Sequence, residues 1–263
     1  MRWLGVFAVA AAGVALAAAG LFLLRDDGPE ELAPDLDQAA PSKLKIVEEG
    51  DTYLLVFASA VDNVGAGPLV IEGERPGRTT PAMTVGQLLR RSDGSTRERE
   101  VPGEIRYVTS ETHEHWHLLG FEMYELRRAR NGKLVEPDAK TGFCLGDRYE
   151  TAEGDDLEGE PERPVWTEEC GRGQSGLLQL SEGISPGYGD DYDPELEGQF
   201  FNVTNVPAGR YLLVHRANPE RVLEESDYEN NAASVLIQLR RDGAIPSVRV
   251  LERCPDADRC ARD

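Results

Sequence analysis

Short runs of apolar and β-branched residues recur along the chain, and most alternate with polar positions, which is typical of β-strands. Asn131-Gly132 and Asp242-Gly243 each lie between two such runs as hairpin signals, and Asp93-Gly94 also suits a tight turn with positive φ. Only residues 83–91 favour a helix. The pattern predicts strands over residues 44–47, 53–60, 68–71, 105–108, 116–126, 200–203, 211–215, 234–239 and 247–251.

These strands indicate an all-β fold. The chain has 263 residues, enough for a full core, and a β-sandwich of this length is commonly one domain. Residues 147–169 are crowded with acidic residues, Gly and Pro and predict a long loop, which in a compact domain is often functional. We expect one β-sandwich-like domain with long loops over residues 44–263, after a linker with an N-terminal arm over residues 25–43.

The N-terminus predicts a hydrophobic helix. Residues 3–24 form an apolar run between Arg2 and Arg25 that is long enough to cross a bilayer. Residues 17–19 offer small side chains for signal cleavage, but the apolar run continues past them. Residues 1–24 therefore favour a signal-anchor over a cleaved signal peptide. The expected location is the cell surface with the domain outside, and secretion is the alternative.

The net charge limits the kinds of molecule that the protein is expected to bind. With 28 basic and 48 acidic residues the formal net charge is −20, which argues against binding to nucleic acid or to an anionic membrane surface. A cationic partner suits this charge, although acidity also simply keeps a protein soluble.

The cysteines predict two disulfides, because an exported chain is exposed to oxidising conditions. Cys254 and Cys260 are close in sequence and suit a short loop, which leaves Cys144 with Cys170. Four cysteines allow three connectivities, so this pairing is an inference.

Three of the four histidines, His113, His115 and His117, alternate along one predicted strand. Alternate residues on a strand project from the same face about 7 Å apart, so the three imidazoles can converge on one ion. Imidazole suits copper, zinc, iron or nickel, and copper binds most tightly where it is available. The alternative is a charged edge strand with incidental histidines. The apolar residues that follow predict a strand with one face in water.

Several motifs together resemble one family. The H-x-H-x-H strand is followed by Lys-Thr-Gly-Phe-Cys-Leu-Gly-Asp at 140–147, by Gly-Ile-Ser-Pro-Gly at 183–187 and by Asp-Asp-Tyr at 190–192. Glu-Ser-Asp-Tyr-Glu-Asn-Asn at 225–231 continues the series. In order and spacing these motifs resemble the catalytic domain of lysyl oxidases over residues 35–260, and agreement of several motifs is more specific than any one.

The resemblance implies a copper-dependent amine oxidase. His113, His115 and His117 would bind copper, and Lys140 and Tyr192 would cross-link to form lysine tyrosylquinone. Such an enzyme converts primary amines to aldehydes, uses dioxygen and releases hydrogen peroxide and ammonia. The substrates would be primary amines, with lysine side chains of an extracellular protein as one candidate. Asp190 and Asp191 are candidates for the base, but turn-capping loop residues are the plainer interpretation.

The resemblance also implies a calcium site. Carboxylate and amide oxygens are hard ligands that suit calcium, whereas the plain alternative is that Asn230 and Asn231 shape a turn. The implied ligands are Asp35, the Leu36 carbonyl, Glu225, Asp227, Asn230 and Asn231.

The chain departs from the animal enzymes of this family at three positions. Thr112, Tyr188 and Gly198 stand where those enzymes carry cysteines, so their substrate preference cannot be transferred. Two other functions stay open: an extracellular copper- or zinc-binding protein without oxidase activity, and a structural or adhesion module in which the histidines have no role.

Overall fold

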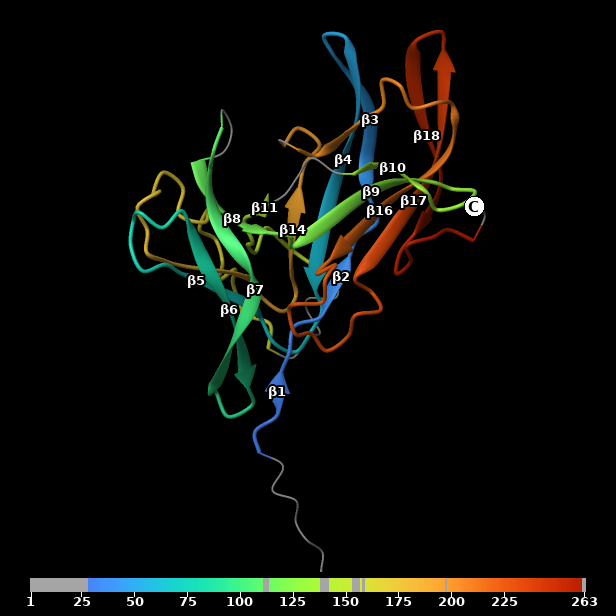
Figure 1. Ribbon diagram of the computed structural model, residues 1–263. Helices are drawn as coiled ribbons and strands as arrows, with labels where there is room; N and C mark the ends of the chain where they lie inside the picture. Colours follow the sequence, from blue (N-terminus) through green and yellow to red (C-terminus); the bar gives the residue numbers. More distant parts are fainter. Residues whose placement is uncertain are drawn as a thin grey trace, which may run out of the picture.

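The computed structural model describes residues 28–110, 114–137, 142–152, 157, 159–196 and 198–261. Within these ranges every regular element is a β-strand, so the predicted all-β class is confirmed (Figure 1). The predicted N-terminal helix falls on residues 1–24, outside the described ranges. The described part holds no helix of the length and apolar character that a membrane span requires.

A seven-stranded sheet carries the predicted histidine strand. Its strands are β1 (Glu31–Leu32), β5 (Leu69–Glu74), β6 (Ala82–Arg91), β7 (Thr96–Thr109), β8 (Glu114–Leu119), β11 (Gly142–Phe143) and β13 (Gln179–Ile184). They follow the order β11-β8-β7-β6-β5-β13, and β1 pairs with β6. The teal and green strands of this sheet lie on the left in Figure 1.

A five-stranded sheet forms the other side of the molecule, with its orange and red strands on the right in Figure 1. Its order is β10-β9-β16-β17-β18, and all its pairs are antiparallel. The strands are β9 (Glu122–Arg128), β10 (Leu134–Pro137), β16 (Gly209–Ala217), β17 (Ala232–Asp242) and β18 (Ile245–Cys254).

The remaining strands gather around one long strand, β4 (Thr52–Asn63). The first half of β4 pairs with β3 (Ser42–Glu49) and β15 (Phe200–Asn202). The second half pairs with β2 (Leu36–Gln38) and β14 (Tyr188–Tyr192), and β14 also pairs with β12 (Tyr149–Glu150). The N-terminal arm therefore contributes two strands, β1 and β2, and Leu36 of β2 is fully buried.

A row of buried aromatic rings joins the three sheets. Phe57 of β4 packs against Tyr124 of β9 and Phe201 of β15, each at 5.3 Å between ring centroids. Tyr124 contacts Phe143 of β11, whose ring stands edge-on to Tyr192 of β14 at 5.3 Å. Edge-to-face aromatic pairs add directional packing to apolar burial. Tyr192 is therefore held at the end of a packed aromatic row.

Two elements differ from the sequence-based predictions. Residues 83–91 belong to strand β6 and not to a helix, because Met83, Val85 and Leu89 are buried at alternate positions with the period of a strand. The run 116–126 is broken at Gly120, whose φ of 73° favours glycine. This break sends β8 into one sheet and β9 into another.

The other local signals are confirmed. Each remaining predicted strand overlaps an observed one. Asn131-Gly132 and Asp242-Gly243 connect paired strands, β9 with β10 and β17 with β18. The disulfides join Cys144 to Cys170 and Cys254 to Cys260, as the spacing favours. Between residues 147 and 169 the only strand in the described part is the short β12.

Candidate active site

A cavity of about 280 Å³ opens where β8, β14 and the segment after β11 meet. Its lining includes two of the predicted metal ligands, His115 and His117, and the predicted cofactor residue Tyr192. The chain brings these three together from strands of two sheets. Cys144, Arg148 and Asp190 also line this active-site cavity.

The two histidines point to one place. His115 and His117 are each 7% exposed, and their Nε2 atoms are 2.6 Å apart. Nitrogens on one tetrahedral ion at about 2.0–2.1 Å lie about 3.3 Å apart, so a small movement of the rings would admit a metal. Both faces of β8 are buried, because Trp116 and Leu118 pack on the other side. The expectation of a face in water is therefore wrong: the histidine face borders the cavity.

Lys140 and His113 lie outside the described residues. The chain that follows Lys140 can still be traced, because β11 pairs with β8 through Gly142 opposite Leu119 and Phe143 opposite Leu118. A Cβ on Gly142 would stand 2.6 Å from the Cβ of His117. The backbone two residues after Lys140 therefore runs directly against a candidate metal ligand.

Tyr192 is held in place by its hydroxyl and its ring. The hydroxyl donates toward Asp190 Oδ2 at 2.7 Å and the Cys144 carbonyl at 3.1 Å. Burial raises the pKa of Tyr192 well above its ordinary value, and the charge of Asp190 raises it further. The phenol is therefore protonated at neutral pH, with its proton directed at the Asp190 carboxyl group.

Asp190 is a site residue that sequence reasoning set aside. It lies in β14 rather than in a turn, and it is 1% exposed whereas Asp191 is exposed. Burial raises the pKa of Asp190 to about 8, and Arg148 Nε lies 3.5 Å from Asp190 Oδ1. The missed signal is alternation: Asp190 and Tyr192 are two apart on one strand and so share a face.

Asp147 fixes the loop beside the cavity. Its Oδ1 accepts a bond from the Ser185 amide, and its Oδ2 accepts bonds from the amides of Val165 and Trp166 and from the Ser185 hydroxyl. A buried carboxylate with four donors is a strong organising centre. Together with the Cys144–Cys170 disulfide, Asp147 ties the ends of the 147–169 segment to the strand that leads to β14.

The model of the lysyl oxidase family matches residues 92–248, more than half of the chain. The chain belongs to the lysyl oxidase family. It is 32% identical over 120 residues to lysyl oxidase homolog 1 of Homo sapiens, an alignment that covers 45% of this chain and 18% of that protein. It is 28% identical over 123 residues to protein-lysine 6-oxidase of Gallus gallus, an alignment that covers 45% of this chain and 24% of that protein. It is 29% identical over 160 residues to lysyl oxidase homolog 2 of Bos taurus, an alignment that covers 59% of this chain and 18% of that protein.

The chain therefore spans less than a quarter of the length of these three relatives. The family suggested by the motifs is confirmed.

The residues suggested as calcium ligands form a second cluster. Glu225 Oε2 accepts a bond from the Leu36 amide at 2.9 Å, and Oε1 accepts one from Asn231 Nδ2 at 2.9 Å. Asp35 Oδ1 accepts a bond from Asn230 Nδ2 at 2.7 Å. Five of the six suggested residues are thus brought together. Asp227 instead accepts a bond from the Glu229 amide in its own turn.

Two oxygens in this cluster suit a cation. In the described part of the chain the buried Oδ1 atoms of Asn230 and Asn231 have no hydrogen-bond partner. Buried acceptors are normally satisfied, and amide oxygens are common calcium ligands. Burial also raises the pKa of Glu225 to about 7, so the metal-free cluster carries less negative charge than its composition suggests.

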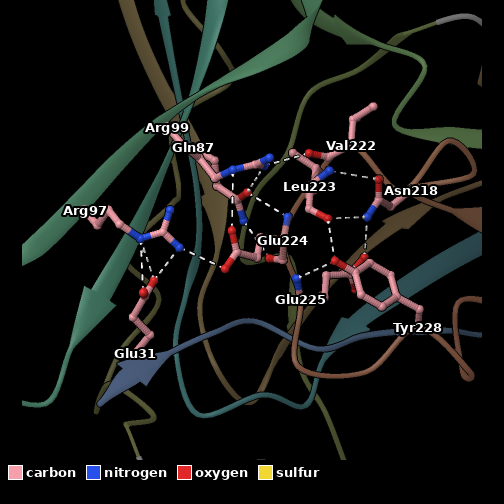
Figure 2. A network of polar contacts seen from close by, with 10 residues as sticks. All are labelled: Glu31, Gln87, Arg97, Arg99, Asn218, Val222, Leu223, Glu224, Glu225 and Tyr228. Carbon is pink, nitrogen blue, oxygen red and sulfur yellow. Dashed lines mark hydrogen bonds and ion pairs between the residues drawn. The ribbon is translucent and has the colours of Figure 1, made fainter. Parts of the chain in front are cut away.

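A polar network fastens the loop before this cluster to the seven-stranded sheet (Figure 2). Gln87 of β6 donates to the Glu224 carbonyl and accepts from the Glu224 amide, each at 2.8 Å. Arg99 of β7 donates to the Val222 carbonyl at 2.7 Å, and Arg97 pairs with the Glu224 carboxylate at 2.8 Å. Part-exposed ion pairs contribute little stability. The hydrogen bonds of the buried Gln87 amide therefore contribute most to holding this loop against the sheet.

Proposed function

We propose that this chain is a copper- and lysine tyrosylquinone-dependent amine oxidase that converts primary amines to aldehydes and releases hydrogen peroxide and ammonia. One observation carries the proposal: in a member of the lysyl oxidase family, His115, His117 and Tyr192 line one cavity. Dioxygen would be the electron acceptor. The alternative, a copper- or zinc-binding protein without oxidase activity, would use the histidines but not Tyr192.

His113, His115 and His117 would hold the copper. The two described rings offer imidazole nitrogens in a buried pocket, a donor set that suits copper. When bound, copper with dioxygen supplies the oxidising power that makes the quinone from Tyr192 and Lys140, and the quinone carries the amine oxidation. The path of β11 beside His117 supports Lys140 as the partner, because it brings the chain near Lys140 to the same cavity.

Asp190 would accept the phenolic proton of Tyr192. The 2.7 Å bond gives the phenolic proton a direct acceptor, and a carboxyl pKa of about 8 lets Asp190 exchange that proton near neutral pH. Arg148 beside Asp190 stabilises the ionised carboxylate, which is the form that can accept the phenolic proton. Phe143 keeps the Tyr192 ring in one orientation.

The substrate class follows from size and charge. The cavity of about 280 Å³ admits a slender amine rather than a bulky ligand. The formal charge of −20 favours cationic amines. Lysine side chains of an extracellular protein are therefore candidate substrates.

The location and the domain plan stay proposals. Residues 1–24 would anchor the chain in a membrane or be cleaved as a signal peptide, and residues 25–43 would form a linker with an N-terminal arm. Residues 44–263 would be the lysyl oxidase-like catalytic domain, at the cell surface or secreted. Two disulfides in the fold suit such an oxidising environment.

Calcium would bind the second cluster. The hard ligands would be the amide oxygens of Asn230 and Asn231, which have no partner among the described residues, and the carboxylates of Asp35 and Glu225. The Leu36 carbonyl and Asp227 are further candidates. The ion would bind the N-terminal arm to the start of β17.

The test is peroxide release from the copper-loaded protein in air, with alkylamines, diamines and a lysine-rich protein as substrates. The proposal expects release from the parent and none from Tyr192→Phe or Lys140→Ala, while both variants still bind copper. Tyr107→Phe is the matched control, because this tyrosine of β7 bonds the Glu114 carbonyl and does not line the cavity. Tight copper binding without peroxide from any amine would favour the metal-binding alternative.

A further inference from the structure

A second cavity, of about 410 Å³, lies against the active-site cavity. The same two chain segments border both: Cys144 lines the first and Leu145 the second, while Glu169 and Arg172 line the first and Glu168 and Gly171 the second. The disulfide Cys144–Cys170 joins these two segments. The two cavities therefore lie side by side, with the disulfide in their common wall.

The second cavity has both apolar and polar lining residues, and its one buried ionisable side chain is acidic. Val165, Trp166, Leu177 and Leu180 supply apolar surface. Among the described lining residues there is no lysine, arginine or histidine. An anion would find no basic side chain here, whereas a cation with an aliphatic body would find both kinds of partner that it needs.

Glu182 of β13 supplies the acidic group and is 2% exposed. Its Oε2 accepts a bond from the Leu145 amide at 3.2 Å and lies 3.0 Å from Cys170 Sγ. Its Oε1 has no hydrogen-bond partner among the described residues, although buried carboxyl oxygens are normally satisfied. The mechanism proposed above makes no use of this carboxyl group.

The contact with the disulfide is the geometry expected of a protonated Glu182. A disulfide sulfur carries no proton, so the Glu182–Cys170 contact is a hydrogen bond only if the carboxyl group keeps its proton. Burial raises the pKa of Glu182 well above its ordinary value, which agrees with this geometry. A buried neutral acid ionises when a cation arrives to pair with it.

We propose that the second cavity binds a primary alkylammonium group, with Glu182 as its counter-ion and Trp166, Leu177 and Leu180 around its methylene chain. An ammonium group donates three hydrogen bonds and also interacts favourably with an indole face. A lysine side chain has this chemistry. If the amine oxidase function proposed above holds, on which this step rests, the cavity holds a second lysine of the substrate beside the lysine that is oxidised.

Binding at this site is coupled to pH. Glu168 lines the same cavity as Glu182, Asp190 of β14 and Arg148 act on the pKa of Glu182, and the disulfide is uncharged. An ammonium that binds the ionised carboxylate displaces its proton, so affinity rises with pH until the amine itself loses its charge near pH 10. Amine binding should therefore release a proton from Glu182 to the solvent at neutral pH.

The test is calorimetry with pentylamine on the full chain carrying Tyr192→Phe, which cannot make the quinone and so cannot consume the ligand. We expect binding with proton release, measured from the dependence of the heat on buffer ionisation enthalpy. Adding Glu182→Gln should weaken binding by about 10- to 100-fold, the cost of one charge-assisted hydrogen bond, and abolish the proton release. Glutamine keeps an acceptor for the Leu145 amide, so the fold is preserved. Glu168→Gln, an exposed lining residue, is the matched control and should weaken binding far less.

Pentylamine binding that is absent, or equally tight with Glu182→Gln, overturns the inference. These results are distinct from failure of the proposed function, which is the absence of peroxide from the copper-loaded parent. Amine oxidation by the parent without Glu182-dependent binding would leave the oxidase proposal standing and remove the second site.

Discussion

Replacing Asp190 by Asn should flatten the pH dependence of the stability of the copper-free protein. The pKa of Asp190 is about 8 in the fold, against 3.8 for the free side chain. Between these values the folded state keeps a proton that the unfolded state releases, so the free energy of unfolding falls as pH rises. Each pH unit in this window costs about 1.4 kcal/mol, and the loss between pH 5 and pH 8 is about 3 to 4 kcal/mol.

The Asn variant has no proton to lose at this position. Its carboxamide oxygen can still accept from the Tyr192 hydroxyl, so the packing is kept. Glu182 and Glu225, whose pKa values are also raised by burial, titrate in both proteins and cancel in the difference.

The assay is urea unfolding at pH 5, 6, 7 and 8, followed by fluorescence, with Asp191→Asn as the control on the exposed neighbouring position. We expect the parent to lose about 3 kcal/mol more than Asp190→Asn across this range, and Asp191→Asn to follow the parent. Equal slopes for the parent and Asp190→Asn would refute the argument that Asp190 is buried as a neutral acid.

Three further predictions follow from the structure. His115→Ala should lose tight copper binding, measured by metal analysis after dialysis. The control His215→Gln should retain it, because His215 is buried but does not line the active-site cavity; retention in His115→Ala would contradict the assignment. Phe57→Ala should lower the free energy of unfolding by about 3–5 kcal/mol, because a fully buried ring at the centre of the aromatic row leaves a cavity; a loss below about 1 kcal/mol would contradict this. Calcium at about 100 times its dissociation constant should stabilise the parent by about 2.7 kcal/mol but not Asp35→Asn, and equal thermal shifts in both would remove Asp35 from the site.

Much of the fold was predictable because the strands carry clear local signals. The alternation of apolar and polar residues predicted most of the strands, and the Asn-Gly and Asp-Gly dipeptides predicted two hairpins. The prediction of a helix over residues 83–91 was wrong because neighbouring apolar residues such as Leu88 and Leu89 also fit a helical period. Pairing with β5 and β7 makes this segment a strand. Strand β14 was missed because its two aspartates suggest a turn, whereas long-range pairing with β4 makes this segment a strand in which Asp190 is buried.

The candidate site was also only partly predictable from the sequence. The spacing of His115 and His117 and the motif around Tyr192 were enough to nominate them, and the fold brings them to one cavity. Asp190 and Glu182 could not be ranked by sequence, because their significance depends on burial. A carboxyl group becomes chemically distinctive when the surrounding packing removes water from it, and that packing comes from residues distant in the sequence.

The central claim is that Lys140 and Tyr192 form one cofactor, and peptide mass mapping tests it most directly. The chain is loaded with copper in air, digested after reduction and alkylation, and compared with copper-free protein. The account predicts that the peptide containing Lys140 becomes covalently joined to the peptide containing Tyr192, reacts with phenylhydrazine, and stays unjoined in Tyr192→Phe. Recovery of both peptides unlinked from protein that holds copper at full occupancy would contradict the account.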